Sequence, residues 1–136
     1  MLKSIATGTF DFKKLIESNS YYVDKTSIIE ELIKNRKEVY LFSRPRRFGK
    51  SLFISMLDNF FNIEYKDINA YLFDGLYISK SEYYKNLSSR PVINVSFKEL
   101  EANNYEDIYD MYKTIIHKVD YVHNLTWLLF LLMLNF

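Results

Sequence analysis

Apolar residues recur three or four positions apart in several stretches of the chain, which is the spacing of one buried helix face. This pattern predicts helices over Phe10–Asn19, Lys50–Asn62 and Asn103–Val119, and a further helix that begins after Asp24 or Ser27. Ser27 and Glu30 fit the S-x-x-E capping box at the start of that helix. The expected inward face of Lys50–Asn62 comprises Leu52, Phe53, Met56, Leu57, Phe60 and Phe61.

Two short runs have the composition of strands. Glu38–Ser43 is rich in β-formers and bounded by charge, and Arg90–Phe97 begins with Pro91 where a missing N–H does least harm. Between them the pattern predicts short helices and a turn at Asp74–Gly75. The alternation of helices and strands predicts an α/β fold with a parallel sheet.

The end of the chain departs from this alternation. Residues 125–136 are almost wholly apolar, and as a helix these 12 residues would span about 18 Å, against about 30 Å for the hydrocarbon core of a bilayer. We therefore expect no membrane span. The sequence predicts an N-terminal domain over residues 1–119 and an atypical tail over 120–136 that is buried or drives self-association. A truncated or frameshifted end is an alternative.

Composition limits the function further. The chain has 136 residues, 49% of them hydrophobic, which suffices for one domain with a core. Its net charge of +1 gives no overall field for polyanions, so any basic function depends on a local cluster. Cysteine is absent and the N-terminus lacks the apolar region of a signal peptide, so we expect a cytoplasmic protein. His117 and His123 lack the spacing of a metal-binding helix.

A candidate phosphate-binding loop lies between the first predicted strand and the next predicted helix. Gly49-Lys50-Ser51 matches the end of the pattern G-x-x-x-x-G-K-[ST], in which the lysine contacts the β- and γ-phosphates and the hydroxyl binds Mg²⁺. Arg44 occupies the place of the first glycine. The context of strand, loop and helix favours triphosphate binding in spite of that difference.

The same loop is strongly basic, which leaves two alternatives. Arg44, Arg46, Arg47 and Lys50 lie within seven positions with no acid among them. They suit a nucleic-acid-binding module, against which the net charge of +1 argues, or a solvated basic turn. A non-functional truncated fragment, or an interaction protein that associates through its tail, is a further alternative.

Three segments together resemble the predicted AAA-ATPase-like family of P-loop proteins. They are "YYVDKTSIIEELIKN", "VYLFSRPRRFGKSLFISMLDNFF" and "RPVINVSFKEL", and the resemblance covers about Ile5 to Ile116. Arginine in place of the first glycine is itself typical of that family. The resemblance implies the N-terminal part of a three-layer αβα fold with parallel strands, and ATP with Mg²⁺ as ligands.

The resemblance also assigns roles to residues. Ser51 would be the Mg²⁺ ligand, and the segment containing Tyr22 and Asp24 resembles a box that lies near the adenine, although Asp24 also suits a helix cap. The family's D-E-Y-D strand has no counterpart here, because Asp74 is followed by Gly75 in a predicted turn. We therefore expect little hydrolysis by this chain and assign no catalytic residue. The expected loop contacts with ATP are Arg44, Pro45, Arg46, Arg47, Phe48, Gly49, Lys50, Ser51 and Leu52.

Overall fold

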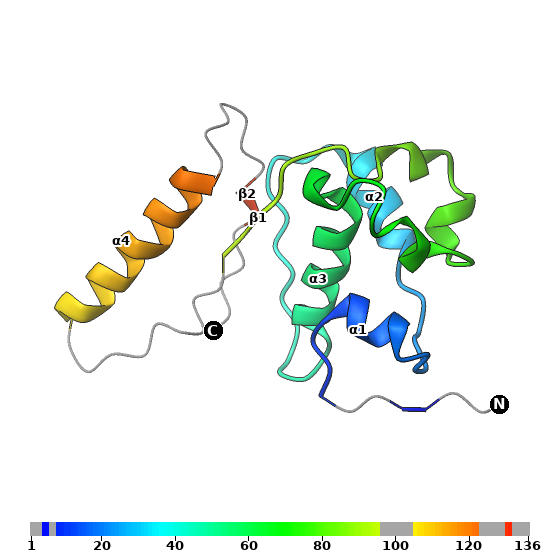
Figure 1. Ribbon diagram of the computed structural model, residues 1–136, viewed down its shortest axis with the longest axis horizontal. Coiled ribbons are helices and arrows are strands. Elements are labelled where there is room, and N and C mark those ends of the chain that lie inside the picture. Colours follow the sequence, from blue (N-terminus) through cyan, green and yellow to red (C-terminus); the bar gives the residue numbers. More distant parts are fainter. Residues whose placement is uncertain (1–3, 6–7, 96–104, 123–129, 132–136) are drawn as a thin grey trace. The chain divides into compact units, whose positions relative to one another are not determined.

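The computed structural model of the chain describes residues 4–5, 8–95, 105–122 and 130–131 (Figure 1), and the side chains of 115–122 and 130–131 are left out of the description. The chain divides into two compact units, Met1–Arg90 and Pro91–Phe136. The expected division at residue 119 stays a prediction. Apart from the backbone of 120–122 and 130–131, the predicted tail lies outside the described residues.

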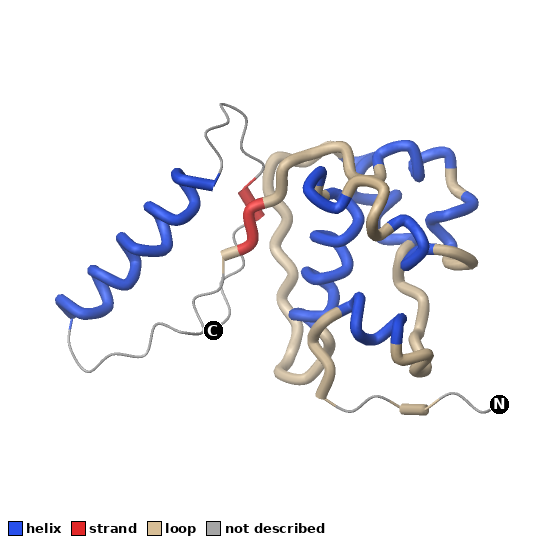
Figure 2. Tube along the Cα trace, in the orientation of Figure 1, coloured by secondary structure: helices blue, strands red, loops and turns tan. Residues whose placement is uncertain are grey.

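The first unit is built from helices and extended connections (Figures 1 and 2). Three α-helices confirm the helical stretches predicted in this part of the chain, and the predicted short helices of residues 63–90 are 3₁₀ turns. The turn at Asp74–Gly75 is also confirmed, with φ 76° at Gly75. The elements are α1 (Phe12–Glu17), α2 (Ser27–Asn35), α3 (Lys50–Phe61), η1 (Ile63–Tyr65), η2 (Ala70–Phe73), η3 (Tyr77–Lys80) and η4 (Glu82–Asn86).

The second unit contains β1 (Ile93–Asn94), α4 (Tyr105–Val122) and β2 (Phe130–Leu131). The two strands pair in parallel, with Ile93 opposite Phe130 and Asn94 opposite Leu131. Helix α4 confirms the helix predicted over Asn103–Val119, but its described side chains are exposed apart from the half-buried Met111. No helix in the described part of the chain is both long enough and apolar enough to cross a bilayer.

The predicted three-layer αβα fold with parallel strands is wrong. The described residues are mostly helical, and the strands among them are β1 and β2, of two residues each. Residues 39–43 are extended but belong to no strand, and the side chains of Val39 and Leu41 are 81% and 84% exposed. The prediction of a buried strand over Glu38–Ser43 is therefore wrong. A strand also requires a neighbour for its hydrogen bonds, and a local pattern does not specify one.

An aromatic cluster fills the core of the first unit. The fully buried rings of Phe12 and Phe60 each contact Phe73, with both centroid distances at 5.3 Å. Phe12 comes from α1, Phe60 from α3 and Phe73 from η2, so the cluster joins three elements. Burying side chains of this size stabilises the fold by roughly 1.5–3 kcal/mol each.

Helix α3 also carries polar side chains into the core. The Ser55 hydroxyl accepts a hydrogen bond from the Phe12 N–H at 2.9 Å, and Asn59 Nδ2 donates to the Ser55 carbonyl at 2.7 Å. Asn69 Nδ2 donates to Asn59 Oδ1 at 2.7 Å, and the Asn69 side chain lies almost wholly inside the protein. These bonds connect α3 to the start of α1 and to the residue before η2.

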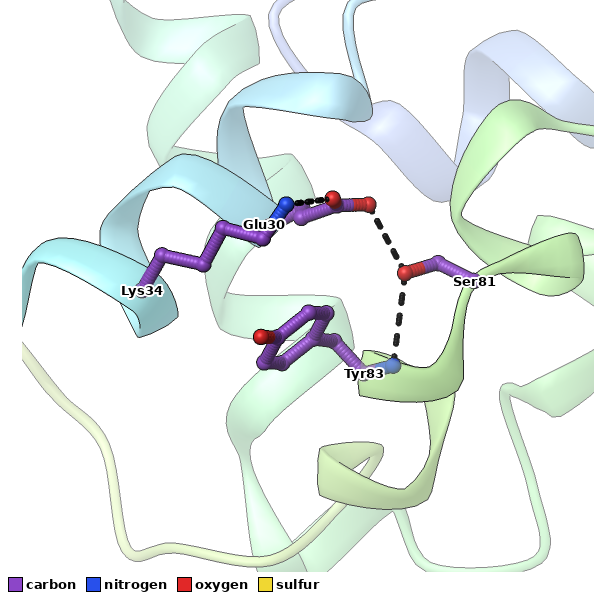
Figure 3. Close-up of polar contacts among 4 residues, drawn as sticks. All are labelled: Glu30, Lys34, Ser81 and Tyr83. Carbon is purple, nitrogen blue, oxygen red and sulfur yellow. Dashed lines mark hydrogen bonds and ion pairs between the residues drawn. The ribbon is translucent and has the colours of Figure 1, made fainter.

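The expected Ser27–Glu30 capping box does not form. Thr26 is the N-cap of α2 and Ser27 is its first helical residue. The Glu30 carboxylate instead forms an ion pair with Lys34 and accepts a hydrogen bond from the Ser81 hydroxyl at 2.8 Å (Figure 3). The Lys34 ammonium lies 5.5 Å from the centre of the Tyr83 ring. This cluster connects α2 to η4, which follows it by some fifty residues.

The buried amide pair gives a test of this core. Replacing Asn69 with alanine leaves Asn59 Oδ1 buried without its donor, so Asn69→Ala should lower the free energy of unfolding by about 1–3 kcal/mol in urea denaturation. Asn35→Ala removes an exposed amide and should change it by less than about 0.5 kcal/mol. Equal effects of the two substitutions would contradict the described core.

Candidate functional site

The start of α3 is fixed by the backbone conformation of Gly49. This residue is the N-cap of the helix with φ 74°, and its carbonyl accepts the Phe53 N–H at 2.9 Å. Glycine adopts a positive φ without the steric cost that other residues incur. Two positions earlier, Arg47 also has a positive φ of 66°. Two residues with a left-handed backbone conformation therefore lie immediately before the helix.

The first turn of α3 presents backbone donors that the helix itself does not use. The first N–H groups of any α-helix lack partners within the helix, and no described side chain caps α3. Gly49 has no Cβ, and the space that a Cβ would meet is open. Together with the positive end of the helix dipole, these donors favour an anion at this position.

The basic residues of the loop lie just before the helix start and at its first position, and the three arginines among them face solvent. Arg44, Arg46 and Arg47 are exposed, and neither ion pair within the described part of the chain involves an arginine. Lys50 is half-buried at the first position of α3, and the next residue, Ser51, is exposed. Of the other expected loop residues, Pro45 and Phe48 are exposed and Leu52 is half-buried.

Aromatic contacts hold the segment that leads into the loop. The Phe42 ring packs edge-on against Phe53 of α3, with centroids 4.8 Å apart, and Tyr40 stacks on Phe42 at 6.3 Å. The Tyr40 hydroxyl donates to the Leu32 carbonyl of α2 at 2.9 Å and accepts the Lys37 N–H at 3.2 Å. Sequence reasoning assigned no role to Tyr40 or Phe42, although two aromatics two positions apart indicate one shared face.

Tyr22 lies at the edge of the aromatic core. Its ring is 5.4 Å from that of Phe12, in an edge-on arrangement, and its hydroxyl donates to the Met56 sulfur at 3.3 Å. Burial raises the pKa of Tyr22 to about 12, so the phenol stays neutral and retains its proton for this bond. These contacts attach the segment before α2 to both α1 and α3.

Asp24 joins the start of α2 to η3. Its Oδ1 accepts hydrogen bonds from the Thr26 N–H and hydroxyl at 2.8 and 2.7 Å, and its Oδ2 accepts the Tyr77 N–H at 2.6 Å. The Thr26 hydroxyl oxygen in turn accepts the Ile78 N–H at 3.1 Å. Partial burial raises the pKa of Asp24, but these hydrogen bonds outweigh it and hold the pKa below its usual value.

The donors at the loop fit a phosphate better than they fit a bare metal ion. Backbone N–H groups, the Lys50 ammonium and the arginines all suit phosphate oxygens, whereas the Ser51 hydroxyl is the one expected metal ligand. No group of three or more His, Asp or Glu side chains gathers among the residues that the structure describes. A magnesium ion here would therefore take most of its ligands from phosphate oxygens and water.

Comparison with known proteins identifies the family to which the chain belongs. The family model described as "Predicted AAA-ATPase" matches residues 6–126, so the chain belongs to this family. The resemblance expected from the RPRRFGKS loop and its neighbouring segments is thereby confirmed.

A protein of Azotobacter chroococcum mcd 1, described as an uncharacterized protein in the vnfD 5′ region, is 38% identical over 96 residues. The match covers 70% of this chain and 17% of that protein, so the chain corresponds to a small part of its relative. No solved structure matches the chain significantly.

The Asp24 contacts predict a pH-dependent contribution to stability. Asp24→Asn exchanges charge-assisted hydrogen bonds for neutral ones, and should lower the free energy of unfolding at pH 7 by about 1 kcal/mol. Because the folded-state pKa is depressed, this contribution is present above the unfolded pKa of about 3.9 and is lost as the pH falls through the folded value.

Urea denaturation at pH 7 and pH 2.5 measures this difference between wild type and variant. The control Asp74→Asn alters an exposed carboxylate that accepts no hydrogen bond from a described residue, and should have little effect at either pH. A difference for Asp24→Asn that is as large at pH 2.5 as at pH 7 would contradict the proposed role of its charge.

Proposed function

We propose that the loop Arg44–Ser51 binds ATP through its triphosphate, and that this chain supplies the phosphate-binding part of an AAA-ATPase-like protein. The observation that carries the proposal is the position of Gly49-Lys50-Ser51 at the uncapped start of α3. Membership of the predicted AAA-ATPase family supports nucleotide as the class of ligand.

Each part of the loop has a distinct role in this proposal. Backbone N–H groups at the start of α3 donate to phosphate oxygens, and Lys50 adds a charge-assisted contact to the terminal phosphates. The Ser51 hydroxyl is a ligand of the Mg²⁺ that accompanies ATP. Arg44, Arg46 and Arg47 neutralise phosphate charge, and their guanidinium groups suit bidentate contacts. Pro45, Phe48 and Leu52 border the phosphates.

Tyr22 and Asp24 form a separate part of the proposal. Both oxygens of Asp24 already accept hydrogen bonds, which favours the helix-anchoring role over a contact with the adenine. The Tyr22 hydroxyl is likewise engaged with Met56. An adenine contact by either residue stays a prediction of the family resemblance. ATP as the ligand favours a cytoplasmic location.

Nucleic-acid binding is the second candidate, because the three arginines of the loop are exposed and form no ion pair with a described residue. The two functions differ in their response to salt. Binding of a nucleic acid through several phosphates weakens steeply with salt, whereas ATP should persist through Lys50 and the helix start. Titrations with ATP and with a single-stranded oligonucleotide at 50 and 300 mM salt separate them.

Calorimetric titration of ATP with Mg²⁺ tests the proposal directly. Lys50→Ala removes the ammonium group at the helix start and should weaken ATP binding by at least about tenfold, or ~1.4 kcal/mol. The control Lys66→Ala alters an exposed lysine at the end of η1 and should leave the affinity unchanged. Equal affinities of wild type and Lys50→Ala for ATP would refute the proposal.

A further inference from the structure

The candidate phosphate-binding loop has little support along its own length. Every residue from Ser43 to Gly49 is exposed, and none from Ser43 to Phe48 forms a hydrogen bond or ion pair with another residue that the structure describes. The loop joins the extended segment 39–43 to the start of α3 (Figure 1). Its conformation therefore depends on how these two ends are held.

One aromatic contact connects the two ends of the loop. Phe42 lies two positions before Arg44, and its ring packs edge-on against Phe53 in the second turn of α3, with centroids 4.8 Å apart and ring planes at 62°. Edge-on aromatic pairs at this distance are favourable beyond the area that they bury. No hydrogen bond between described residues joins the same two segments, so the ring contact closes the base of the loop.

Both rings are themselves fixed to neighbouring elements. Tyr40 stacks on Phe42 at 6.3 Å, and its hydroxyl donates to the carbonyl of Leu32 in the last turn of α2 at 2.9 Å. On the other side, the Phe53 N–H donates to the Gly49 carbonyl at 2.9 Å. Phe53 thus contacts the loop base through its ring and the start of the helix through its backbone.

The closed base gives the loop a fixed conformation before any ligand binds. A loop that is already held in its binding conformation loses less freedom on binding, which increases affinity. We propose that Phe42 is a positioning residue of the candidate phosphate site, and that its contact with Phe53 holds the backbone donors of residues 49–51 in place. The inference rests on the proposed function for its effect on ATP, whereas its effect on the free loop is measured without nucleotide.

Phe42→Leu keeps an apolar side chain but removes the ring, and Phe61→Leu is its matched control. Phe61 is also half-buried on α3 and packs edge-on against a ring, that of Phe60 at 5.0 Å, but it lies at the opposite end of the helix from the loop. Calorimetric titration of the full chain with ATP and Mg²⁺ should show binding that is about three- to tenfold weaker in Phe42→Leu and unchanged in Phe61→Leu. Phe42→Tyr keeps the ring and should restore most of the affinity.

Amide hydrogen exchange of the free chain gives a second measurement. Exchange at the Phe53 N–H, which bonds the Gly49 carbonyl, should be at least about threefold faster in Phe42→Leu, because the helix start opens more often when the loop base is released. Phe61→Leu should leave this rate unchanged. Absence of ATP binding by the wild type would refute the proposed function, and the exchange rates would still decide the role of Phe42.

A double-mutant cycle keeps the test independent of any one variant. Phe53→Leu removes the same contact from the helix side and should weaken ATP binding to a similar extent as Phe42→Leu. The double variant should bind no more weakly than either single variant, because the contact is already lost in each. The inference is overturned if Phe42→Leu and Phe61→Leu change Phe53 exchange equally, if wild type and Phe42→Leu bind ATP equally, or if the two single effects add.

Discussion

Helix α3 is the element on which the first unit depends, because it carries apolar and polar anchors on the same side. Phe60 enters the aromatic cluster, while the chain of bonds through Ser55 and Asn59 secures α1 and Asn69. Buried amide groups are costly when unpaired, so these bonds also specify how the neighbouring segments pack. A helix fixed in this way along its length has a well-defined start, and that start is the candidate phosphate site.

The sequence predicts the helices well because their signal is local. The spacing of apolar residues in Lys50–Asn62 defines α3 to within one residue, and Gly49 before it correctly marks the boundary. The same spacing gives no warning that Asn59 is buried, since its partner Asn69 lies on the far side of a turn. The Asp24–Tyr77 bond is equally invisible to local pattern, because its partners are 53 positions apart.

The failure of the predicted sheet has a related cause. Glu38–Ser43 has the composition of a buried strand, but composition indicates an extended backbone and not the presence of a neighbour. In the structure, Tyr40 and Phe42 satisfy one face through α2 and α3, and Val39 and Leu41 remain exposed.

The family assignment and the local geometry support the same kind of ligand on separate grounds. The family match concerns most of the chain, whereas the donors at Gly49 are a property of one helix start. Hydrolysis would need groups that hold Mg²⁺ and position water in addition to a phosphate cradle, so the proposed function is confined to binding. The match covers 17% of its relative, so the proposal concerns this chain and does not extend to the activity of a whole protein of that length.

The central claim is that phosphate oxygens meet the backbone donors at the start of α3. An NMR titration of the ¹⁵N-labelled chain with ATP and Mg²⁺ observes these donors directly. The account predicts that the largest amide shifts occur from Phe48 to Leu52, with small shifts at the other basic site, Arg36 and Lys37. Shifts that are absent from Phe48–Leu52, or that are equally large at Arg36 and Lys37, would contradict it.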